Sequence, residues 1–164
     1  TNGYSMNIFY LHRDPFHAAV VQYNTHVVKM ILESAQMLCT AHHVFNNGHN
    51  VPYKKAHINQ PSTIWVRQAD THYYWLYDHM LALGEEYTKR YGKVHLTITK
   101  CKDALKFAPK GIPLKYAIQE PPQCMPDDYK VKNDAVTAYW NYYENEKHTV
   151  KNSDEQLITR ECLV

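Results

Sequence analysis

Apolar residues, with one histidine among them, recur at steps of three and four positions between residues 25 and 45. This spacing places them along one side of an α-helix. The repeating residues are Val27, Val28, Ile31, Ala35, Leu38, His42 and Phe45. The run Asn46-Asn47-Gly48 then ends the predicted helix. A helix with one apolar side is stable only when other elements cover that side, so the rest of the chain is expected to pack around it.

A second long helix is predicted over residues 71–91, and Gly92 after it suits the left-handed conformation that ends many helices. The apolar line of this helix consists of Leu76, Met80, Leu83 and Tyr87. Shorter helices are indicated by their starting signals. Asp14 precedes Pro15 as an N-cap, Pro61 opens another helix, and Thr97 is predicted to cap a third. The predicted short helices cover 15–23, 61–67, 97–107 and 133–147.

The segments between these helices have different characters. Residues 7–11 form a short extended apolar run, residues 46–60 form a polar loop, and five prolines within 108–128 favour an irregular arm. The fold is therefore predicted to be all-α or nearly so: a compact single-domain helical bundle with a short extended N-terminal segment and a proline-rich arm. Residues 1–5 are expected to be a leader, 6–147 the helical domain and 148–164 a polar tail.

Length and composition exclude several classes of protein. The 164 residues, 45% of them hydrophobic, suffice for one core but not for two. There is no apolar run of about 18 residues and no recognisable signal peptide, so we expect a cytoplasmic protein that binds no membrane. The five scattered glycines cannot build a dinucleotide turn or a phosphate loop, so no cofactor is predicted. The four cysteines never pair as CxxC and no HExxH occurs, so no metal is predicted either. The oligomeric state is left open.

The 25–45 helix also carries a polar stripe. Its residues, again at steps of three and four, are His26, Lys29, Glu33, Gln36, Thr40 and His43. A solvated helix face has the same periodicity, and this alternative stays open. The mixture of an amine, a carboxylate, an amide, a hydroxyl and two imidazoles nevertheless favours a site that handles protons. Lys29 and Glu33 lie one turn apart, so they are expected to interact.

Two further groups of residues suit phosphate. The first consists of His57, Pro61, Trp65 and Arg67 at a loop-to-helix junction, where the backbone amides of the helix start and a guanidinium fork can hold an anion. In the alternative interpretation, Trp65 is a core anchor and Arg67 is a surface charge.

The second group lies around the helix end at Gly92 and consists of Arg90, Lys93 and His95. A turn that carries these side chains can contact phosphate. Basic residues also stabilise the C-terminal end of any helix through its dipole, so this alternative is kept as well.

Several stretches of the chain resemble a family of small proteins common in tailed-phage genomes. They are Met6–Phe9, His26–Glu33, Gln60–Trp65, Glu86–His95 and Met125–Lys130. The chain is also faintly similar to the phage pyrimidine-dimer DNA glycosylase, endonuclease V. That family is compact and helical, and it cuts the glycosidic bond with the amine of its own N-terminus and a carboxylate from an Arg-Glu pair on its first helix. The comparable place here holds Tyr23-Asn24-Thr25-His26, so none of those residues is carried over.

The resulting hypothesis is a phage-type enzyme that acts on DNA or nucleotides, with base or glycosidic-bond chemistry of the DNA glycosylase/lyase kind. Glu33 is the predicted general acid/base, and Lys29 and His26 hold or activate the substrate. Phosphate is held by the basic residues, and Trp65 or a tyrosine stacks on a base. The predicted substrate-binding residues are His43, His57, Trp65, Arg67, Arg90, Lys93 and His95.

The alternative hypothesis is a non-catalytic protein that binds nucleic acid or a host protein; a virion component is a third. A concave pocket that gathers His26, Lys29, Glu33 and His57 favours an enzyme, whereas a flat basic surface favours binding alone. In a pocket Glu33 is expected to lose water, which raises its pKa. Only about 0.04% of an unperturbed lysine is neutral at pH 7, so an exposed Lys29 serves as a binding group rather than a nucleophile.

Overall fold

The computed structural model describes residues 6–146. The predicted leader (1–5), the last residue of the predicted 133–147 helix and the predicted polar tail (148–164) lie outside this range. Within it the chain forms helices and loops without a strand, and more than half of residues 14–146 are helical, as predicted. The helices are α1 (Pro15–Val20), α2 (Asn24–Val44), α3 (Pro61–Arg67), α4 (Asp70–Tyr91), α5 (Leu96–Cys101) and α6 (Ala135–Asn145), with 3₁₀ turns at Gly48–Asn50 and Asp127–Tyr129.

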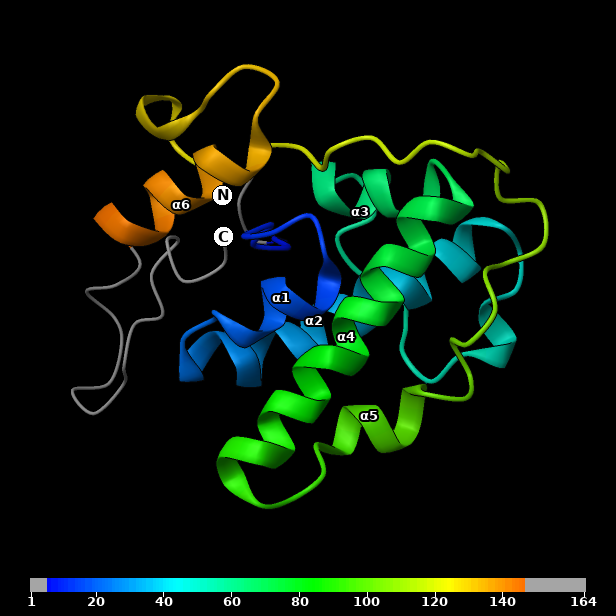
Figure 1. Cartoon of the computed structure of the whole chain (residues 1–164). Coiled ribbons are helices and arrows are strands. Elements are labelled where there is room, and N and C mark those ends of the chain that lie inside the picture. Colours follow the sequence, from blue (N-terminus) through cyan, green and yellow to red (C-terminus); the bar gives the residue numbers. More distant parts are fainter. Residues whose placement is uncertain (1–5, 147–164) are drawn as a thin grey trace.

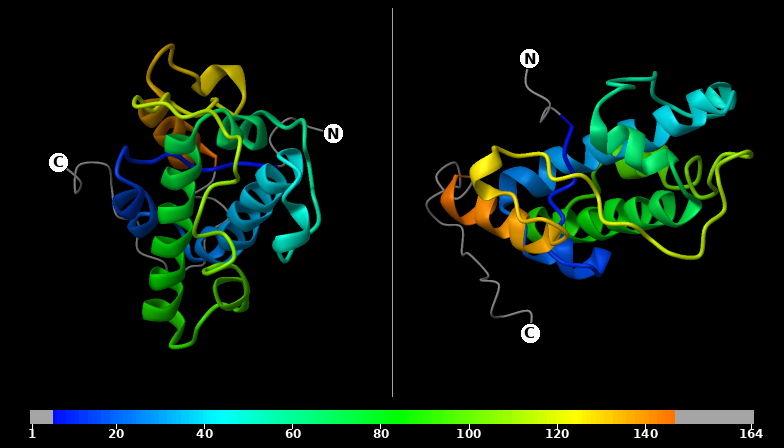
Figure 2. Two further views of the ribbon diagram at one scale, coloured as in Figure 1. Left: turned by 90° about the vertical axis from the view of Figure 1, so that its right-hand side faces the viewer. Right: turned by 90° about the horizontal axis from the view of Figure 1, so that it is seen from above.

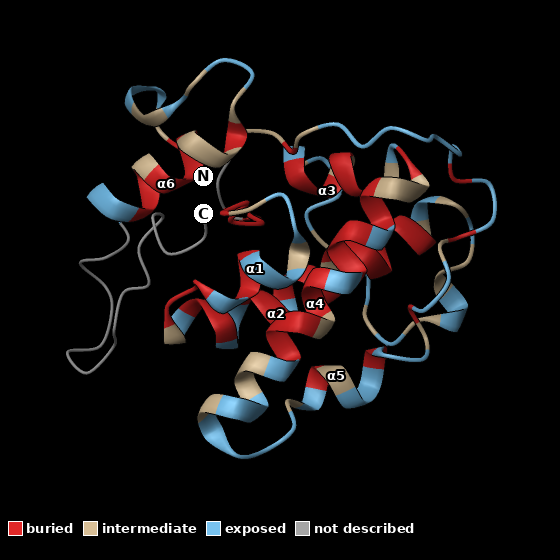
Figure 3. Ribbon diagram, in the orientation of Figure 1, coloured by how far each residue is buried: buried red, intermediate tan, exposed pale blue. Residues whose placement is uncertain are grey.

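The two long helices form the centre of the fold. α2 packs along α4, α1 lies on α4, and α3 contacts both long helices (Figure 1). The predicted apolar sides meet there, since Ile31 and Leu38 of α2 and Met80 and Leu83 of α4 are fully buried. Figure 3 shows the buried residues concentrated where α1, α2 and α4 come together. The prediction of a compact all-α domain around these two helices is confirmed.

Most of the residues predicted to begin or end a helix do so in the structure. The Asp14 carboxylate accepts hydrogen bonds from the backbone N–H groups of Phe16 and His17 at 2.8 and 3.2 Å, and Gly92 ends α4 with φ 74°. The predicted 97–107 helix is wrong at both ends. His95 is the N-cap because its Nδ1 accepts from the Thr97 N–H at 3.1 Å, which puts Thr97 inside the first turn. The chain leaves the helix after Cys101 in a series of turns.

Three buried histidines bridge segments of the core. In each, one ring nitrogen donates to an oxygen and the other accepts from a nitrogen, which requires a neutral imidazole. His72 donates to the Trp65 carbonyl at 2.8 Å and accepts from the Gln119 N–H at 3.0 Å. His79 lies between the Pro15 carbonyl and the Gln22 amide in the same way, and His42 lies between Tyr73 and Asn47. Several of the chain's many histidine and tyrosine side chains are therefore buried and form hydrogen bonds within the core.

Two non-helical segments complete the structure. Residues 6–11 are buried, and the Trp140 indole of α6 donates to the Leu11 carbonyl at 2.7 Å. This segment is not extended throughout, because Phe9 has a φ of 56° and turns the chain. The predicted proline-rich arm follows α5 and crosses the surface beside α3 and α4 before it reaches α6 (Figure 2). No helix among residues 6–146 is long and apolar enough to cross a membrane.

Candidate functional site

A pocket of about 430 Å³ opens along the N-terminal half of α2. Residues of α2 at helical spacing form one wall, and segments distant in sequence form the others. The lining residues are Met6, Val28, Lys29, Leu32, Glu33, Gln36, His57 and His95. Its volume lies in the range of about 300–1,000 Å³ that is usual for small-molecule sites. The pocket brings together four of the predicted site residues, namely Lys29, Glu33, His57 and His95.

Glu33 is the buried carboxyl group of this pocket. Only 7% of the residue is exposed. Its Oε1 accepts a hydrogen bond from the Asn7 N–H at 3.4 Å, and its Oε2 lies 3.7 Å from Lys29 Nζ. Burial raises the pKa of Glu33, and the opposing effects of the Lys29 charge and the Asn7 hydrogen bond are smaller. A carboxyl group whose pKa is raised is closer to the range that suits a general acid/base.

The partner of Glu33 in the N-terminal segment is held in place. The Asn7 side chain donates to the Cys124 carbonyl at 3.0 Å and accepts from the Ile8 N–H at 2.8 Å. The Asn7 backbone N–H therefore has a fixed direction toward Glu33. The carboxyl group is positioned by a segment that is 26 residues away in sequence.

Lys29 is the exposed basic residue at the edge of the pocket. Its side chain is 70% exposed, compared with 9% for its ion-pair partner Glu33. Because its side chain reaches into water at the edge of the pocket, Lys29 suits a binding contact with an anion better than the role of a nucleophile. Of the two predicted roles, holding or activating the substrate, the exposure of Lys29 favours the first.

The two histidines of the pocket differ in their exposure and in their hydrogen bonds. His57 is exposed and has a left-handed φ of 49°, on a loop whose neighbouring Ala56 N–H donates to Thr40 Oγ1 at 3.0 Å. His95 is half-buried, and its Nδ1 accepts a hydrogen bond from the Thr97 N–H at 3.1 Å. Burial lowers the pKa of His95. His57 is thus able to contact a ligand with its ring nitrogens, whereas His95 mainly forms the wall.

The apolar lining of the pocket was not predicted from the sequence. The helical spacing predicts Val28 on the buried side of the helix, but it is 38% exposed, and Leu32 is 40% exposed. Both lie next to Lys29 and Glu33 on α2, so their positions along the helix could have predicted that they line the same pocket. Met6 comes from outside the helix, and no local pattern pointed to it.

His26 is the largest correction to the polar stripe. It is buried, its ring stacks on Phe9 at 4.4 Å, and its Nδ1 lies 2.8 Å from the Tyr143 hydroxyl. The N-terminal segment and α6 cover this first turn of α2. His26 therefore belongs to the core and does not reach the pocket.

Three other predicted binding residues make hydrogen bonds within the protein, and for Arg67, which uses one nitrogen in this way, the phosphate contact stays a prediction. His43 donates to the Tyr53 carbonyl at 2.8 Å, and Arg67 donates to the Ile58 carbonyl at 2.8 Å. Trp65 is 3% exposed, stacks on His72 at 4.2 Å and donates to the Gln119 carbonyl at 3.0 Å. Trp65 is a core anchor, so the prediction that it stacks on a base is wrong. Lys93 is exposed but outside the pocket, and its phosphate contact stays a prediction.

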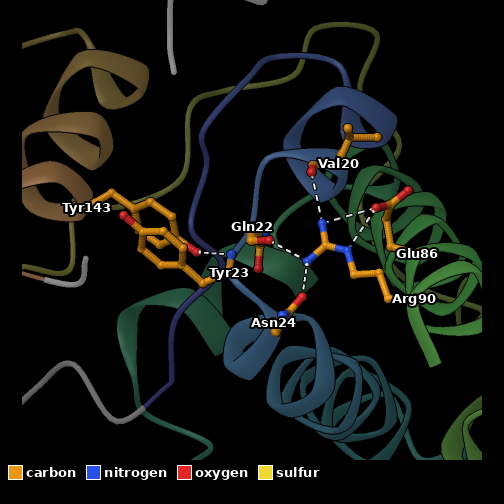
Figure 4. Close-up of polar contacts among 7 residues, drawn as sticks. All are labelled: Val20, Gln22, Tyr23, Asn24, Glu86, Arg90 and Tyr143. Carbon is orange, nitrogen blue, oxygen red and sulfur yellow. Dashed lines mark hydrogen bonds and ion pairs between the residues drawn. The ribbon is translucent and has the colours of Figure 1, made fainter. Parts of the chain in front are cut away.

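Arg90 has a structural role in place of the predicted phosphate contact. Its Nη1 donates to the Gln22 carbonyl at 2.7 Å and to Asn24 Oδ1 at 3.1 Å, and its Nη2 donates to the Val20 carbonyl at 2.9 Å. Glu86 forms an ion pair with the same guanidinium at 3.0 Å (Figure 4). Arg90 thus satisfies the carbonyls between α1 and α2, which explains why α1 ends at Val20 rather than at the predicted Tyr23.

We expect Arg90→Met to lower the free energy of unfolding by roughly 3 kcal/mol, because several partly buried acceptors and the Glu86 carboxylate lose their donor. Lys93→Met, three residues further along, removes an equal charge from an exposed position and should leave the stability unchanged. Urea denaturation at pH 7 compares the two variants. Equal effects would contradict the structural role of Arg90.

Within residues 6–146, no group of three or more histidine, cysteine or acidic residues is arranged to hold a metal ion. The fold and the pocket define a small all-α protein with a buried carboxyl group in a pocket that also carries a lysine and two histidines. No protein-family model matches the sequence, and comparisons with curated proteins and with solved structures found no match. The assignment of a function therefore depends on the site itself.

Proposed function

We propose that this protein is an enzyme that acts on DNA or nucleotides and cleaves a glycosidic bond, with Glu33 as the general acid/base. The observation that supports this proposal is the buried carboxyl group of Glu33 inside a ligand-sized pocket, with the exposed ammonium group of Lys29 at its mouth. The substrate class rests on the resemblance to tailed-phage proteins and to the pyrimidine-dimer DNA glycosylase. The proposal divides the roles among a few residues.

The roles follow from exposure and position. Lys29 attracts a phosphate group of the substrate to the mouth of the pocket, and His57 donates a further hydrogen bond to it. Val28 and Leu32 offer apolar contact to the sugar or the base. Glu33 lies deepest among the polar groups, where its carboxyl group meets the reacting atoms.

The chemistry proposed is hydrolysis by water. The ionised Glu33 takes a proton from a water molecule as the water oxygen bonds to the anomeric carbon. The bond from this carbon to the base nitrogen breaks, its electron pair stays on the base, and the proton held by Glu33 neutralises the leaving group. Because Lys29 is exposed, water is a better candidate for the nucleophile than this amine.

The test is direct detection of the products. Incubation with a panel of nucleotides and of oligonucleotides carrying normal, damaged or modified bases should release a free base, which mass spectrometry identifies. Borohydride should trap no covalent adduct between Lys29 and the sugar. A trapped adduct would overturn the water mechanism, and a panel without any product would count against the enzyme and leave the binding alternative.

A second expected result concerns Lys29 as a binding group. Lys29→Ala should raise KM several-fold and leave kcat nearly unchanged, because an exposed phosphate contact is made equally in the ground state and the transition state. The salt dependence of KM should also become weaker. Lys132→Ala, at an exposed position outside the pocket, serves as the control of equal charge. A large loss of kcat in Lys29→Ala would mean that the amine takes part in the chemistry.

A further inference from the structure

The positive charge of the chain is concentrated in one surface segment, residues 100–116, which we call the basic segment. It contains five lysines and one aspartate, a net charge of +4, whereas the whole chain has +2. The remainder of the molecule is therefore slightly acidic. All five lysines are exposed, and none of them takes part in an ion pair between described residues. A charge of this density in one place suits a polyanionic partner.

The basic segment also exposes large apolar and aromatic side chains between its lysines. Phe107 is 70% exposed, Leu114 is 81% exposed and Tyr116 is fully exposed. The Lys106 ammonium group lies 5.4 Å from the centre of the Phe107 ring. Exposing an aromatic ring to water is unfavourable in free energy, and a base that stacks on the ring removes this exposure. Alternation of lysines with exposed rings is therefore typical of surfaces that bind single-stranded nucleic acid.

The segment is fixed to the protein although its side chains point outward. The Asp70 N–H donates to the Pro113 carbonyl at 2.9 Å, and the Asp70 carboxylate accepts from the Lys115 N–H at 2.9 Å. The Ala108 N–H donates to the Tyr74 hydroxyl at 3.0 Å, and Leu105 and Ile112 are buried. These contacts hold the backbone along α4, where Figure 2 shows it on the outer surface. The backbone that carries the exposed rings is thus fixed before a partner binds, which lowers the conformational entropy lost on binding.

We propose that the basic segment is a binding surface for single-stranded nucleic acid, with Phe107 and Tyr116 stacking on bases and Lys106, Lys110 and Lys115 contacting phosphates. It shares no residue with the pocket of Glu33. The surface deepens the proposed function, since it names the form of nucleic acid that the protein holds, but it does not require that Glu33 be catalytic. A protein partner is the competing occupant, and stacking and salt dependence distinguish the two.

The test measures the binding of the full chain to a fluorescent oligothymidylate of about 15 nucleotides by anisotropy, at several salt concentrations. Lys110→Ala together with Lys115→Ala should reduce the slope of log affinity against log salt by about 1.4, since each phosphate contact on a single strand contributes about 0.7. Tyr116→Leu should weaken binding by roughly 5- to 150-fold, while Tyr116→Phe should bind like the wild type. A double variant of the exposed lysines Lys89 and Lys132, both changed to alanine, is the charge-matched control.

Two results would overturn the inference: no binding of the oligothymidylate at low salt, or equal losses in the Lys110/Lys115 and Lys89/Lys132 variants. An equal effect of Tyr116→Leu on a duplex of the same length would overturn the assignment to single strands. Circular dichroism should show unchanged folding, because the substituted side chains are exposed. Binding through this segment without any turnover would support the inference and sink the proposed glycosidic chemistry. If the protein has turnover and the variants of this segment change neither turnover nor binding, the inference is overturned and the proposed function stands.

Discussion

Glu33→Gln is expected to lower turnover by about a hundredfold or more and to change substrate affinity by only a few-fold. Glutamine keeps the size of the side chain and can still accept the hydrogen bond from the Asn7 N–H. The glutamine amide is not a titrating group, so the general acid/base contribution is lost. The measurement is kcat and the dissociation constant on the same substrate, wild type beside variant. Glu85→Gln, on the exposed surface of α4, is the matched control.

Stability and pH provide two independent readouts of the same change. Since burial raises the pKa of Glu33 in the folded state, the charged form is disfavoured there, and this group stabilises the fold less as pH rises. Glu33→Gln should therefore leave the free energy of unfolding at pH 7 unchanged or higher. The pH profile of kcat/KM should contain an ionisation above the ordinary carboxyl range that the variant lacks. Unchanged turnover would remove Glu33 from the mechanism.

Acidification is expected to unfold the protein between about pH 6.5 and pH 4, because of its buried neutral histidines. Burial lowers the pKa of His79 to about 4 and that of His42 to about 4, from 6.5, and it also lowers the pKa of His72. A lowered folded-state pKa means that the unfolded chain binds more protons over this interval, so stability falls as pH falls. Each of the first two histidines should cost roughly 3 kcal/mol by pH 4. Their sum is comparable to the whole stability of a typical domain.

The reason lies in the hydrogen bonds themselves. Protonation of His79 would turn the nitrogen that accepts from the Gln22 amide into a donor, so two donors would face each other in the core. Denaturation by urea at several pH values measures the effect. His79→Gln should lower the stability at pH 7 but flatten its decline below pH 6.5, whereas His49→Gln, at an exposed position, should leave the curve as it is. A stability that is constant from pH 7 to pH 4.5 would contradict this account.

The sequence by itself determined the elements whose signals are local. Apolar spacing and capping residues predicted α2 and α4 to within one residue at each end, and Pro15 and Pro61 marked the starts of α1 and α3. Helical spacing also placed Lys29 and Glu33 together on one stripe. Each of these properties depends on residues within a few positions of one another, and a single chain contains that information.

Burial was decided by the tertiary structure alone. His26 and Glu33 belong to the same predicted stripe, but α6 and the N-terminal segment cover the first, whereas the second meets the pocket. Arg90 and Lys93 are three residues apart and both carry a positive charge, and only the approach of the α1–α2 connection gives Arg90 its carbonyl partners. Spacing along one helix fixes which residues share a side, but the removal of water from that side depends on segments tens of residues away. Since desolvation sets both the pKa of a carboxyl group and the availability of a guanidinium, the chemistry of this site followed from the packing.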